Sequence, residues 1–227
     1  MRIAVLASGS GSNLKTILTL AEAGRLNAQS VLVLSNNPEA EALSHARAHN
    51  VPVWSKAHQG LSREEFDAEM LGAIKASGAE AVILAGYMRI LSTAFIRAFS
   101  GRILNIHPAI LPSFAGARGG RDALDYQARI TGCTVHFVDE LMDNGPVIIQ
   151  AAVPLTSADS LEDLMPRVHA LEHRIYPQAI QWLAQGRLKV EGRKVTLLPR
   201  AGKALRPAGI GEGEHGPWLV SPALEDF

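Results

Sequence analysis

Short apolar runs alternate with amphipathic stretches along the first half of the chain. The runs 31–34 and 81–84 are apolar at every position, so both faces of each segment need burial. Strands that are buried on both faces are typical of parallel sheets covered by helices. We expect strands at residues 2–7, 30–35, 51–54, 80–85 and 102–106, and helices near 13–24, 38–49, 62–77 and 92–99. The alternation predicts an α/β fold with a doubly wound, mostly parallel, twisted sheet.

Two local signals indicate where helices begin. Ser62 and Glu65 have the spacing of a capping box, in which each side chain bonds the other residue's backbone N–H. Pro38 follows Asn36 and Asn37, which is typical of the first turn of a helix. We therefore expect helices to begin at these two places.

The periodicity changes after residue 108. Residues 108–121 contain two prolines and three glycines, which predicts a long loop that is either functional or disordered. We then expect strands at 131–138 and 146–155, a helix over about 160–185 and a small hairpin at 187–190 and 193–198, which together form an antiparallel carboxyl-terminal portion. The helix carries apolar residues at steps of three and four, namely Leu161, Leu164, Val168, Leu171 and Ile175.

The end of the chain differs in composition from the rest. From about residue 200 it is rich in Pro, Gly and Glu, which predicts an extended or partly disordered tail. We therefore expect one folded domain over residues 1–199 and a Pro/Gly-rich tail over residues 200–227.

The overall composition excludes several classes of protein. The 22 basic and 22 acidic side chains balance, and a surface for nucleic acid needs a clustered cationic excess. Cys133 is the single cysteine, so the chain forms no internal disulfide, which fits a reducing compartment. The apolar run at residues 3–7 is too short for a membrane span or a signal peptide. We expect a cytoplasmic protein that binds neither nucleic acid nor membrane.

A glycine-rich segment follows the first expected strand. Glycines let the chain turn tightly and bring backbone N–H groups toward a ligand, and the amino terminus of a helix adds partial positive charge. Gly11, Ser12 and Asn13 therefore form a candidate phosphate-binding loop at the mouth of the sheet. The segment lacks the lysine of a Walker A loop and the third glycine of the dinucleotide pattern. The alternative is an ordinary glycine-rich turn with a capping side chain.

Asn105 and His107 form a candidate catalytic pair. They alternate with apolar residues, so both point to the same side of an extended segment. An amide donor beside an imidazole suits the stabilisation of a developing oxyanion. The alternative is a buried pair bonded to backbone, but Pro108 and the long loop that follows favour function. Asp143 lies in a turn, and it becomes a candidate for orienting the imidazole only if the fold brings it beside His107.

His169 and His173 match the H-x-x-E-H pattern of some zinc peptidase helices. The sequence offers no evident third ligand, and the helix already has an apolar core face. We therefore expect no metal, and we assign these histidines to surface or substrate-lining positions.

The motifs together resemble the folate-dependent glycinamide ribonucleotide formyltransferases, in order and in approximate spacing, over about residues 1–190. The segments that carry the resemblance are Gly9–Leu14, Ala85–Leu91, Asn105–Pro108, Leu111–Pro112, His136–Val138, Asp143–Pro146 and Glu172–Pro177. The resemblance implies a Rossmann-like formyltransferase fold and a catalytic domain over residues 1–199. Monomer and homodimer both stay open.

The resemblance also implies the ligands, which are glycinamide ribonucleotide as substrate and 10-formyltetrahydrofolate as co-substrate. The glycine loop matches the segment that holds the phosphate, and the acidic residue of the late helix matches the one that contacts the ribose. The residues assigned to the ribonucleotide are Gly11, Ser12, Asn13, Met88, Pro108 and Glu172. The residues assigned to the folate are Arg63, Arg89, Ile90, Leu91, Val138, Glu140 and Asp143.

The chemistry that the resemblance implies is direct transfer. The amine attacks the formyl carbon, Asn105 and His107 stabilise the oxyanion, and Asp143 holds His107 and assists proton movement. One departure stands in the long loop, where Ala115 and Arg118 replace the usual proline and histidine of the family. We expect this loop to be more flexible than in the family and Arg118 to pair with a phosphate or a folate carboxylate.

Three alternatives use the same core. Formyltetrahydrofolate hydrolase usually carries an amino-terminal regulatory domain, whereas the first expected strand here begins at residue 2. Methionyl-tRNA formyltransferase normally adds a carboxyl-terminal domain and a basic surface, for which this chain has neither length nor charge. A ligand-binding domain without activity is the third alternative, and the retained Asn105, His107 and Asp143 argue against it.

Overall fold

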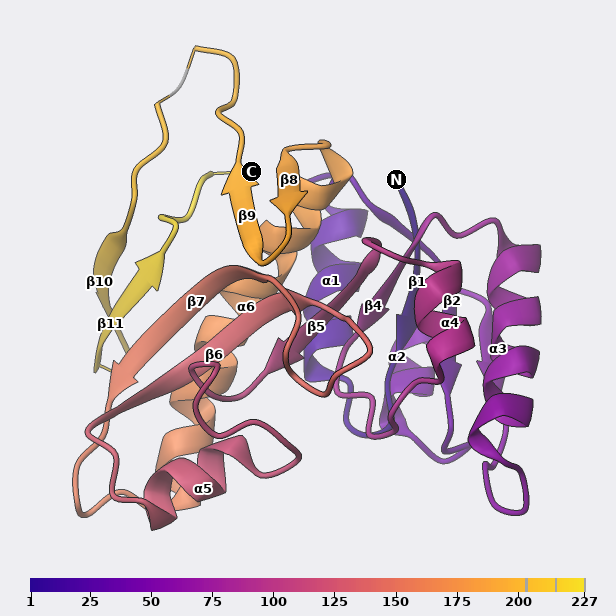
Figure 1. Cartoon of the computed structure of the whole chain (residues 1–227), viewed down its shortest axis with the longest axis horizontal. Coiled ribbons are helices and arrows are strands. Elements are labelled where there is room, and N and C mark those ends of the chain that lie inside the picture. The colour runs from indigo at the N-terminus through magenta and orange to yellow at the C-terminus, as the bar shows by residue number, and fades with distance from the viewer. Residues whose placement is uncertain (203, 215, 227) are drawn as a thin grey trace. The chain divides into compact units, whose positions relative to one another are not determined.

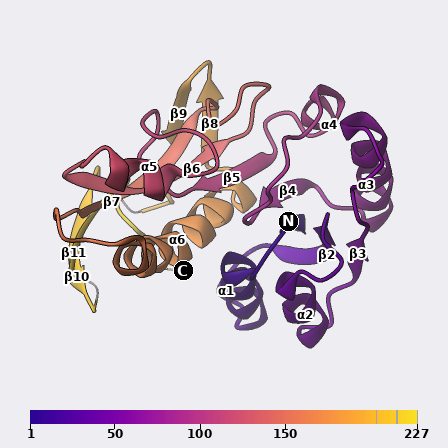
Figure 2. The same cartoon turned by 90° about the horizontal axis from the view of Figure 1, so that it is seen from below.

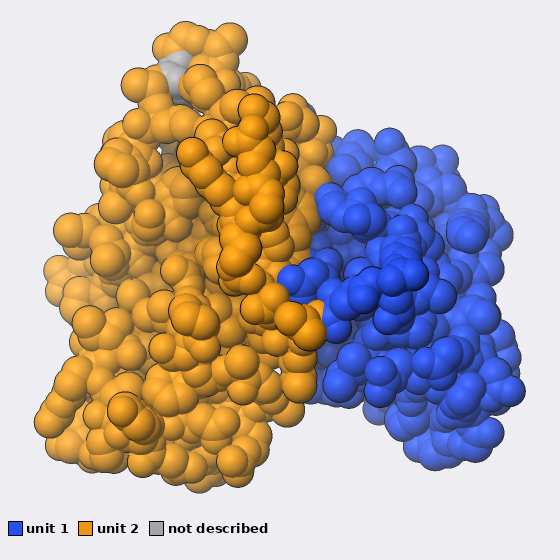
Figure 3. Space-filling view, in the orientation of Figure 1, with its two compact units in different colours: residues 1–105, 138–140 blue, residues 106–137, 141–227 orange. Residues whose placement is uncertain are grey.

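The computed structural model describes residues 1–202, 204–214 and 216–226, and its helices and strands are labelled in Figure 1. The chain divides into two compact units, which Figure 3 draws in different colours. Unit 1 comprises Met1–Asn105 and Val138–Glu140, and unit 2 comprises Ile106–Phe137 and Leu141–Phe227. Each unit is described by itself.

Unit 1 is built on a parallel sheet, as the apolar runs predict. Its strands lie side by side in the order β5, β4, β1, β2, β3, and every neighbouring pair is parallel. The bounds are β1 Arg2–Leu6, β2 Gln29–Ser35, β3 Val53–Ser55, β4 Ala81–Leu84 and β5 Ile103–His107. The last two residues of β5 belong to unit 2.

Four helices cover the sheet of unit 1. They are α1 Ser12–Glu22, α2 Glu41–Ala48, α3 Arg63–Ser77 and α4 Thr93–Ala98. One core cluster joins Leu6 of β1 and Val82 of β4 to Phe66 of α3 and Phe95 of α4. Helix α1 packs against α2, and Figure 2 shows this pair on the sheet face opposite α3 and α4. Helices on both faces confirm the doubly wound fold.

The strand order of unit 1 reverses at β1, which lies between β2 and β4. The loop that follows β1 and the loop that follows β4 therefore begin side by side at the carboxyl ends of these strands, and they bond each other. The N–H of Ala85 donates to the carbonyl of Leu6 at 2.8 Å, and the N–H of Ser8 donates to the carbonyl of Gly86 at 3.0 Å. Open α/β sheets bind ligands at such a reversal.

Unit 2 is antiparallel. Strand β6 (Ile130–Phe137) pairs with β7 (Val147–Pro154), and β8 (Leu188–Glu191) pairs with β9 (Lys194–Leu197) in a separate small sheet. Helix α6 (Leu161–Ala184) packs on β6 and β7, while the short α5 (Gly119–Asp125) packs on α6. No helix within the described part of the chain is long and apolar enough to cross a membrane.

The prediction of an extended or partly disordered tail is wrong for residues 209–213 and 216–221, which form paired strands. Strands β10 (Gly209–Gly213) and β11 (Gly216–Ser221) pair antiparallel, and β11 also pairs with β7. Gly211 makes room for an indole, because a Cβ at that position would lie 2.2 Å from the ring of Trp218. Composition alone does not distinguish a glycine that serves packing from a glycine of a flexible chain.

The two predicted helix starts differ in outcome. The capping box of Ser62 and Glu65 is present, with both reciprocal bonds, and opens α3. The start expected at Pro38 is wrong, because α2 begins at Glu41. The carbonyl and the side-chain oxygen of Asn37 accept bonds from the backbone N–H groups of Ala40 and Glu39, so these residues form a turn instead.

The end of the chain is clamped to the rest of unit 2 through Glu225. Arg187 donates two hydrogen bonds to the Glu225 carboxylate at 2.6 and 2.8 Å, and Trp182 donates a third at 3.2 Å. The backbone N–H of Glu225 donates to the side chain of Gln178 at 2.7 Å. The bonds from Arg187 lower the pKa of Glu225 below its ordinary value of 4.5, and its partial burial opposes this.

We expect Glu225→Gln to lower the melting temperature at pH 7 by about 2–4 °C. A carboxylate whose folded pKa is lowered stabilises the protein above the unfolded pKa, and this contribution is lost as the pH falls through the folded value. The difference from the wild type should therefore shrink as the pH falls below about 4.5. Calorimetry at several pH values measures it. Glu191→Gln removes an exposed carboxylate that pairs with Lys189 at 2.9 Å, and it should leave the melting temperature unchanged.

Candidate active site

The glycine-rich loop of unit 1 has the geometry of an anion-binding helix start. Gly11 has a φ of 73° and is the amino-terminal cap residue of α1. In this fully described helix no side chain caps the first turn, and no acidic residue stands in it. The helix dipole favours negative charge at such a helix start, and anions bind there through backbone N–H groups. The turn also packs tightly, because a Cβ on Gly11 would lie 2.7 Å from Cα of Ala42.

Ser8 links this loop to the segment that follows β4. Its hydroxyl donates to Oδ1 of Asn36 at 2.5 Å and accepts a bond from the N–H of Met88 at 2.9 Å. The loop and the Met88–Leu91 segment are therefore brought together within unit 1. The sequence analysis did not single out Ser8, since a serine among glycines has no distinctive signal.

The Met88–Leu91 segment presents apolar side chains on an anchored backbone. Met88 is 70% and Ile90 is 52% exposed, while Leu91 is buried in the core of unit 1. The guanidinium of Arg89 lies 4.8 Å from the centre of the Phe66 ring. Exposed apolar side chains beside fixed backbone groups are typical of a surface for a flat, partly polar ligand.

Asp67 of α3 anchors the end of this segment. The carboxylate is 1% exposed and accepts a bond from the N–H of Ser92 at 2.5 Å. Burial raises the pKa of Asp67, and the bond from Ser92 and the charges of Arg89 and Arg63 oppose the rise. Arg63, assigned to the folate from the sequence, thus lies within electrostatic range of the base of the segment.

The other folate candidates of unit 1 lie in the return segment at residues 138–140. Val138 packs against the core of unit 1, and its N–H donates to the carbonyl of Ile103 at 3.0 Å. The carboxylate of Glu140 accepts a bond from Nε of Arg97 at 3.0 Å. Asn105 ends the part of β5 that belongs to unit 1 and lies opposite Leu84 in the sheet.

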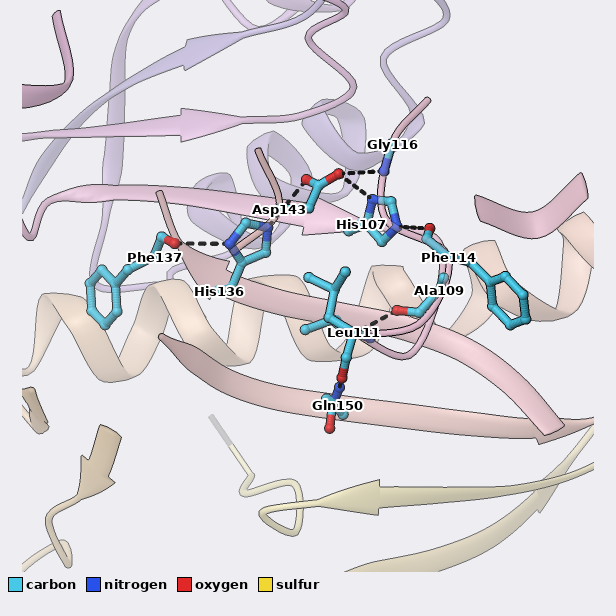
Figure 4. A network of polar contacts seen from close by, with 10 residues as sticks. His107, Ala109, Leu111, Phe114, Gly116, His136, Phe137, Asp143 and Gln150 are labelled. Carbon is cyan, nitrogen blue, oxygen red and sulfur yellow. Dashed lines mark hydrogen bonds and ion pairs between the residues drawn. The ribbon is translucent and has the colours of Figure 1, made fainter. Parts of the chain in front are cut away.

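Unit 2 brings His107 and Asp143 together, as Figure 4 shows. Nδ1 of His107 lies 3.5 Å from Oδ2 of Asp143, and Nε2 of His136 lies 3.8 Å from Oδ1 of the same carboxylate. The two imidazoles are 3% and 2% exposed, and the Asp143 side chain is 12% exposed. The condition set for Asp143 in the sequence analysis is met. His136, which the sequence analysis named only as part of the segment His136–Val138, joins the cluster.

The loop after β5 closes on this cluster. Nε2 of His107 donates to the carbonyl of Phe114 at 2.8 Å, and the N–H of Gly116 donates to Oδ2 of Asp143 at 2.8 Å. A carbonyl only accepts, so Nε2 carries a hydrogen and Nδ1 faces the carboxylate. The Nε2–H of an imidazole held this way can bond either the loop carbonyl or a ligand oxygen in its place.

The turn that carries Asp143 is itself held in place. Asp143 has a φ of 50°, a left-handed conformation that Asp tolerates better than most residues. Arg193, in the turn between β8 and β9, donates to the carbonyl of Asn144 at 2.7 Å. The hairpin of β8 and β9 therefore holds Asn144, the residue next to the catalytic candidate Asp143, from 49 residues away.

Helix α6 holds the remaining candidates of unit 2. Glu172 is 5% exposed. The burial of Cys133 raises the pKa of its thiol, and the charge of Glu172 raises it further. The rings of His169 and His173 stack with centroids 6.5 Å apart, and burial lowers the pKa of both. The described residues contain no group of three or more His, Cys, Asp or Glu side chains placed to hold a metal ion.

Arg118 does not stand alone in the loop. Its guanidinium lies 3.0 Å from the carboxylate of Asp122, one turn later in the chain. The irregular part of the loop is also shorter than expected, because α5 begins at Gly119. Pairing of Arg118 with a phosphate or a folate carboxylate therefore has to compete with this contact.

Comparison with known proteins identifies the family. The model of a family described as formyl transferase matches residues 1–180. The chain is 40% identical over 215 residues to phosphoribosylglycinamide formyltransferase of Escherichia coli (strain K12), which covers 94% of this chain and 100% of that protein.

Solved structures agree with this match. The crystal structure of glycinamide ribonucleotide transformylase 1 from Symbiobacterium toebii is 45% identical, with a TM-score of 0.85 over 88% of this chain and 94% of that chain. A formyltetrahydrofolate deformylase from Pseudomonas syringae pv. tomato is 26% identical, with a TM-score of 0.82 over 87% of this chain and 66% of that chain. The chain therefore belongs to the formyl transferase family.

Proposed function

We propose that this protein transfers the formyl group of 10-formyltetrahydrofolate to the amine of glycinamide ribonucleotide, giving formylglycinamide ribonucleotide and tetrahydrofolate for purine biosynthesis. The observation that carries this proposal is the buried His107–Asp143 pair, 3.5 Å apart, in a chain that matches a phosphoribosylglycinamide formyltransferase along the whole length of that enzyme. We assign the catalytic domain to residues 1–199.

The proposed reaction is a direct attack of the amine on the formyl carbon. A C–N bond forms to the substrate, the bond to N10 of the folate breaks, and the amine proton passes to N10, assisted by Asp143 through water. Asn105 and the Nε2–H of His107 stabilise the oxyanion of the tetrahedral intermediate. In the structure that N–H donates to the Phe114 carbonyl at 2.8 Å, so the oxyanion would take the place of this carbonyl as acceptor. Asp143 keeps the imidazole oriented.

The ribonucleotide is assigned to the residues that the family resemblance implies. Gly11, Ser12 and Asn13 hold its phosphate, which is supported by the uncapped start of α1. Glu172 contacts the ribose hydroxyls, since a buried carboxylate is an acceptor for them. Met88 and Pro108 are also assigned to the ribonucleotide.

The folate is assigned to the exposed apolar segment and its surroundings. Backbone groups of Arg89, Ile90 and Leu91 bond the pterin ring, and Val138, Glu140 and Asp143 close the other side of it. Arg63 faces the glutamate tail. The exposure of Ile90 and the anchoring of the segment by Asp67 support this assignment.

A formyltetrahydrofolate hydrolase is the second candidate, because a deformylase structure matches most of this chain. The two reactions differ in their need for the amine. The protein is incubated with 10-formyltetrahydrofolate with and without glycinamide ribonucleotide, and tetrahydrofolate is measured. Loss of the formyl group only with the ribonucleotide supports transfer. Equal loss in both samples means hydrolysis, and no loss in either sample removes both proposals.

Asn13→Ala should raise the KM for the ribonucleotide about 10- to 100-fold, because a hydrogen bond to a charged phosphate contributes about 1.5–3 kcal/mol. The KM for 10-formyltetrahydrofolate, measured in the same steady-state experiment, is the internal control and should change less than 2-fold. A rise confined to the folate KM would assign the loop to the other ligand.

A further inference from the structure

The chain that leaves His107 cannot be held by strand pairing. Pro108 lacks an N–H, and the strand β5 ends at His107. Ala109 is 0% and Leu111 is 5% exposed, so water does not reach these residues freely. Buried backbone groups need hydrogen-bond partners, and here side chains have to supply them.

Thr134 and Gln150 supply these partners. They lie directly opposite each other in the antiparallel pair of β6 and β7. The Thr134 hydroxyl donates to the carbonyl of Ala109 at 2.7 Å and accepts from the N–H of Leu111 at 3.0 Å. Nε2 of Gln150 donates to the carbonyl of Leu111 at 2.8 Å and to the Thr134 hydroxyl at 3.0 Å. Figure 4 labels Ala109, Leu111 and Gln150 of this network, beside the His107 cluster.

The Thr134 hydroxyl and the Gln150 amide nitrogen use their full bonding capacity. A hydroxyl has one hydrogen and two lone pairs, and an amide nitrogen has two hydrogens. Every one of these groups in Thr134 and Gln150 has a partner. Thr134 is 0% exposed, so solvent offers no replacement if its hydroxyl is removed. A fully satisfied buried network fixes one geometry.

We propose that Thr134 and Gln150 are positioning residues that set the path of the chain after His107 and thereby place its imidazole for the transfer step. This proposal rests on the proposed function. The same loop bonds the cluster twice more, where Phe114 accepts from His107 and Gly116 donates to Asp143. A shift at residues 109–111 is therefore transmitted to both partners of the cluster. A misplacement of about 1 Å lowers a rate by about 100-fold.

The test compares three threonine variants. Thr134→Val keeps the shape and removes the hydroxyl, while Thr134→Ser keeps the hydroxyl. Thr131→Val is the matched control, because Thr131 lies on the same strand, is 1% exposed, and has a buried hydroxyl for which the structure shows no hydrogen-bond partner. We expect Thr134→Val to lower kcat about 10- to 100-fold with both KM values within 3-fold. Thr134→Ser and Thr131→Val should stay within 3-fold of the wild type.

Gln150→Met gives a second measurement if Thr134→Val does not fold. It removes both donors from a residue that is only partly buried, and kcat should fall about 10-fold. Equal kcat values for Thr134→Val, Gln150→Met and Thr131→Val would overturn the proposal. So would a loss confined to KM.

A readout without turnover separates this proposal from the proposed function. The side-chain nitrogen signals of His107, followed by NMR in ¹⁵N-histidine-labelled protein, should shift in Thr134→Val and stay unchanged in Thr131→Val. If the wild type shows no formyl transfer but the signals respond as expected, the proposed function fails and the positioning role stands. If the signals do not respond, the positioning role fails whatever the activity.

Discussion

His107→Ala should lower kcat by about 100- to 1,000-fold while the KM values for both substrates change less than 3-fold. The imidazole is expected to act mainly on the oxyanion, which exists only near the transition state, so its removal lowers turnover more than binding. The ring is 3% exposed and bonds the Phe114 carbonyl, so truncation also leaves that carbonyl without its donor. Steady-state kinetics with each substrate varied in turn measure the effect.

Two further variants make this result specific. Asp143→Asn keeps the size of the side chain but removes the charge that faces both His107 and His136, and it should lower kcat about 100-fold. His49→Ala removes a histidine that pairs with the exposed Glu22 at 2.9 Å, and its kcat should equal that of the wild type. An unchanged rate in His107→Ala would remove this residue from the mechanism.

Gly11→Ala should destabilise the protein by about 2–4 kcal/mol. Gly11 has a φ of 73°, a left-handed conformation that is unfavourable for any residue with a Cβ. The new methyl group would lie 2.7 Å from both Cα and Cβ of Ala42, so helix α2 has to move away. Because the N–H groups of the loop are assigned to the phosphate, the KM for the ribonucleotide should rise as well. Urea denaturation and steady-state kinetics measure the two effects.

Gly9→Ala is the matched control for this prediction. Gly9 lies two residues earlier in the same loop, has no positive φ, and a Cβ there would meet no atom within 4 Å. Its stability should stay within about 0.5 kcal/mol of the wild type. If both alanine variants were equally stable, neither the left-handed conformation nor the contact with Ala42 would matter for folding.

The parallel half of the fold is predictable from sequence because its signals are local. Continuous apolar runs such as 31–34 indicate strands that are buried on both faces, and the structure places this run in β2. The capping box of Ser62 depends on residues three apart, so it reads directly from the chain. The glycine loop is placed correctly for the same reason, since it directly follows β1.

The prediction for the end of the chain failed because a glycine can serve two opposite structural roles. In a free chain it adds flexibility, whereas Gly211 of β10 allows the Trp218 ring to lie against the backbone. The ion pair between Arg187 and Glu225 joins residues that are 38 positions apart, and no short sequence pattern predicts it. Both the packing of the β10 glycine and the pairing of Glu225 with Arg187 depend on partners that the local sequence does not reveal.

The sequence by itself determined that an amide and an imidazole lie two positions apart at the end of a strand, with a glycine-rich loop at the start of the first helix. Only the tertiary structure decided that His107 and His136 meet at the carboxylate of Asp143, and that Thr134 and Gln150 hold the chain next to His107. The physical reason is the range of the interactions. Periodicity and capping act within a few residues, whereas these contacts join side chains and loops that lie far apart in the sequence and meet only when β5, β6 and β7 have folded.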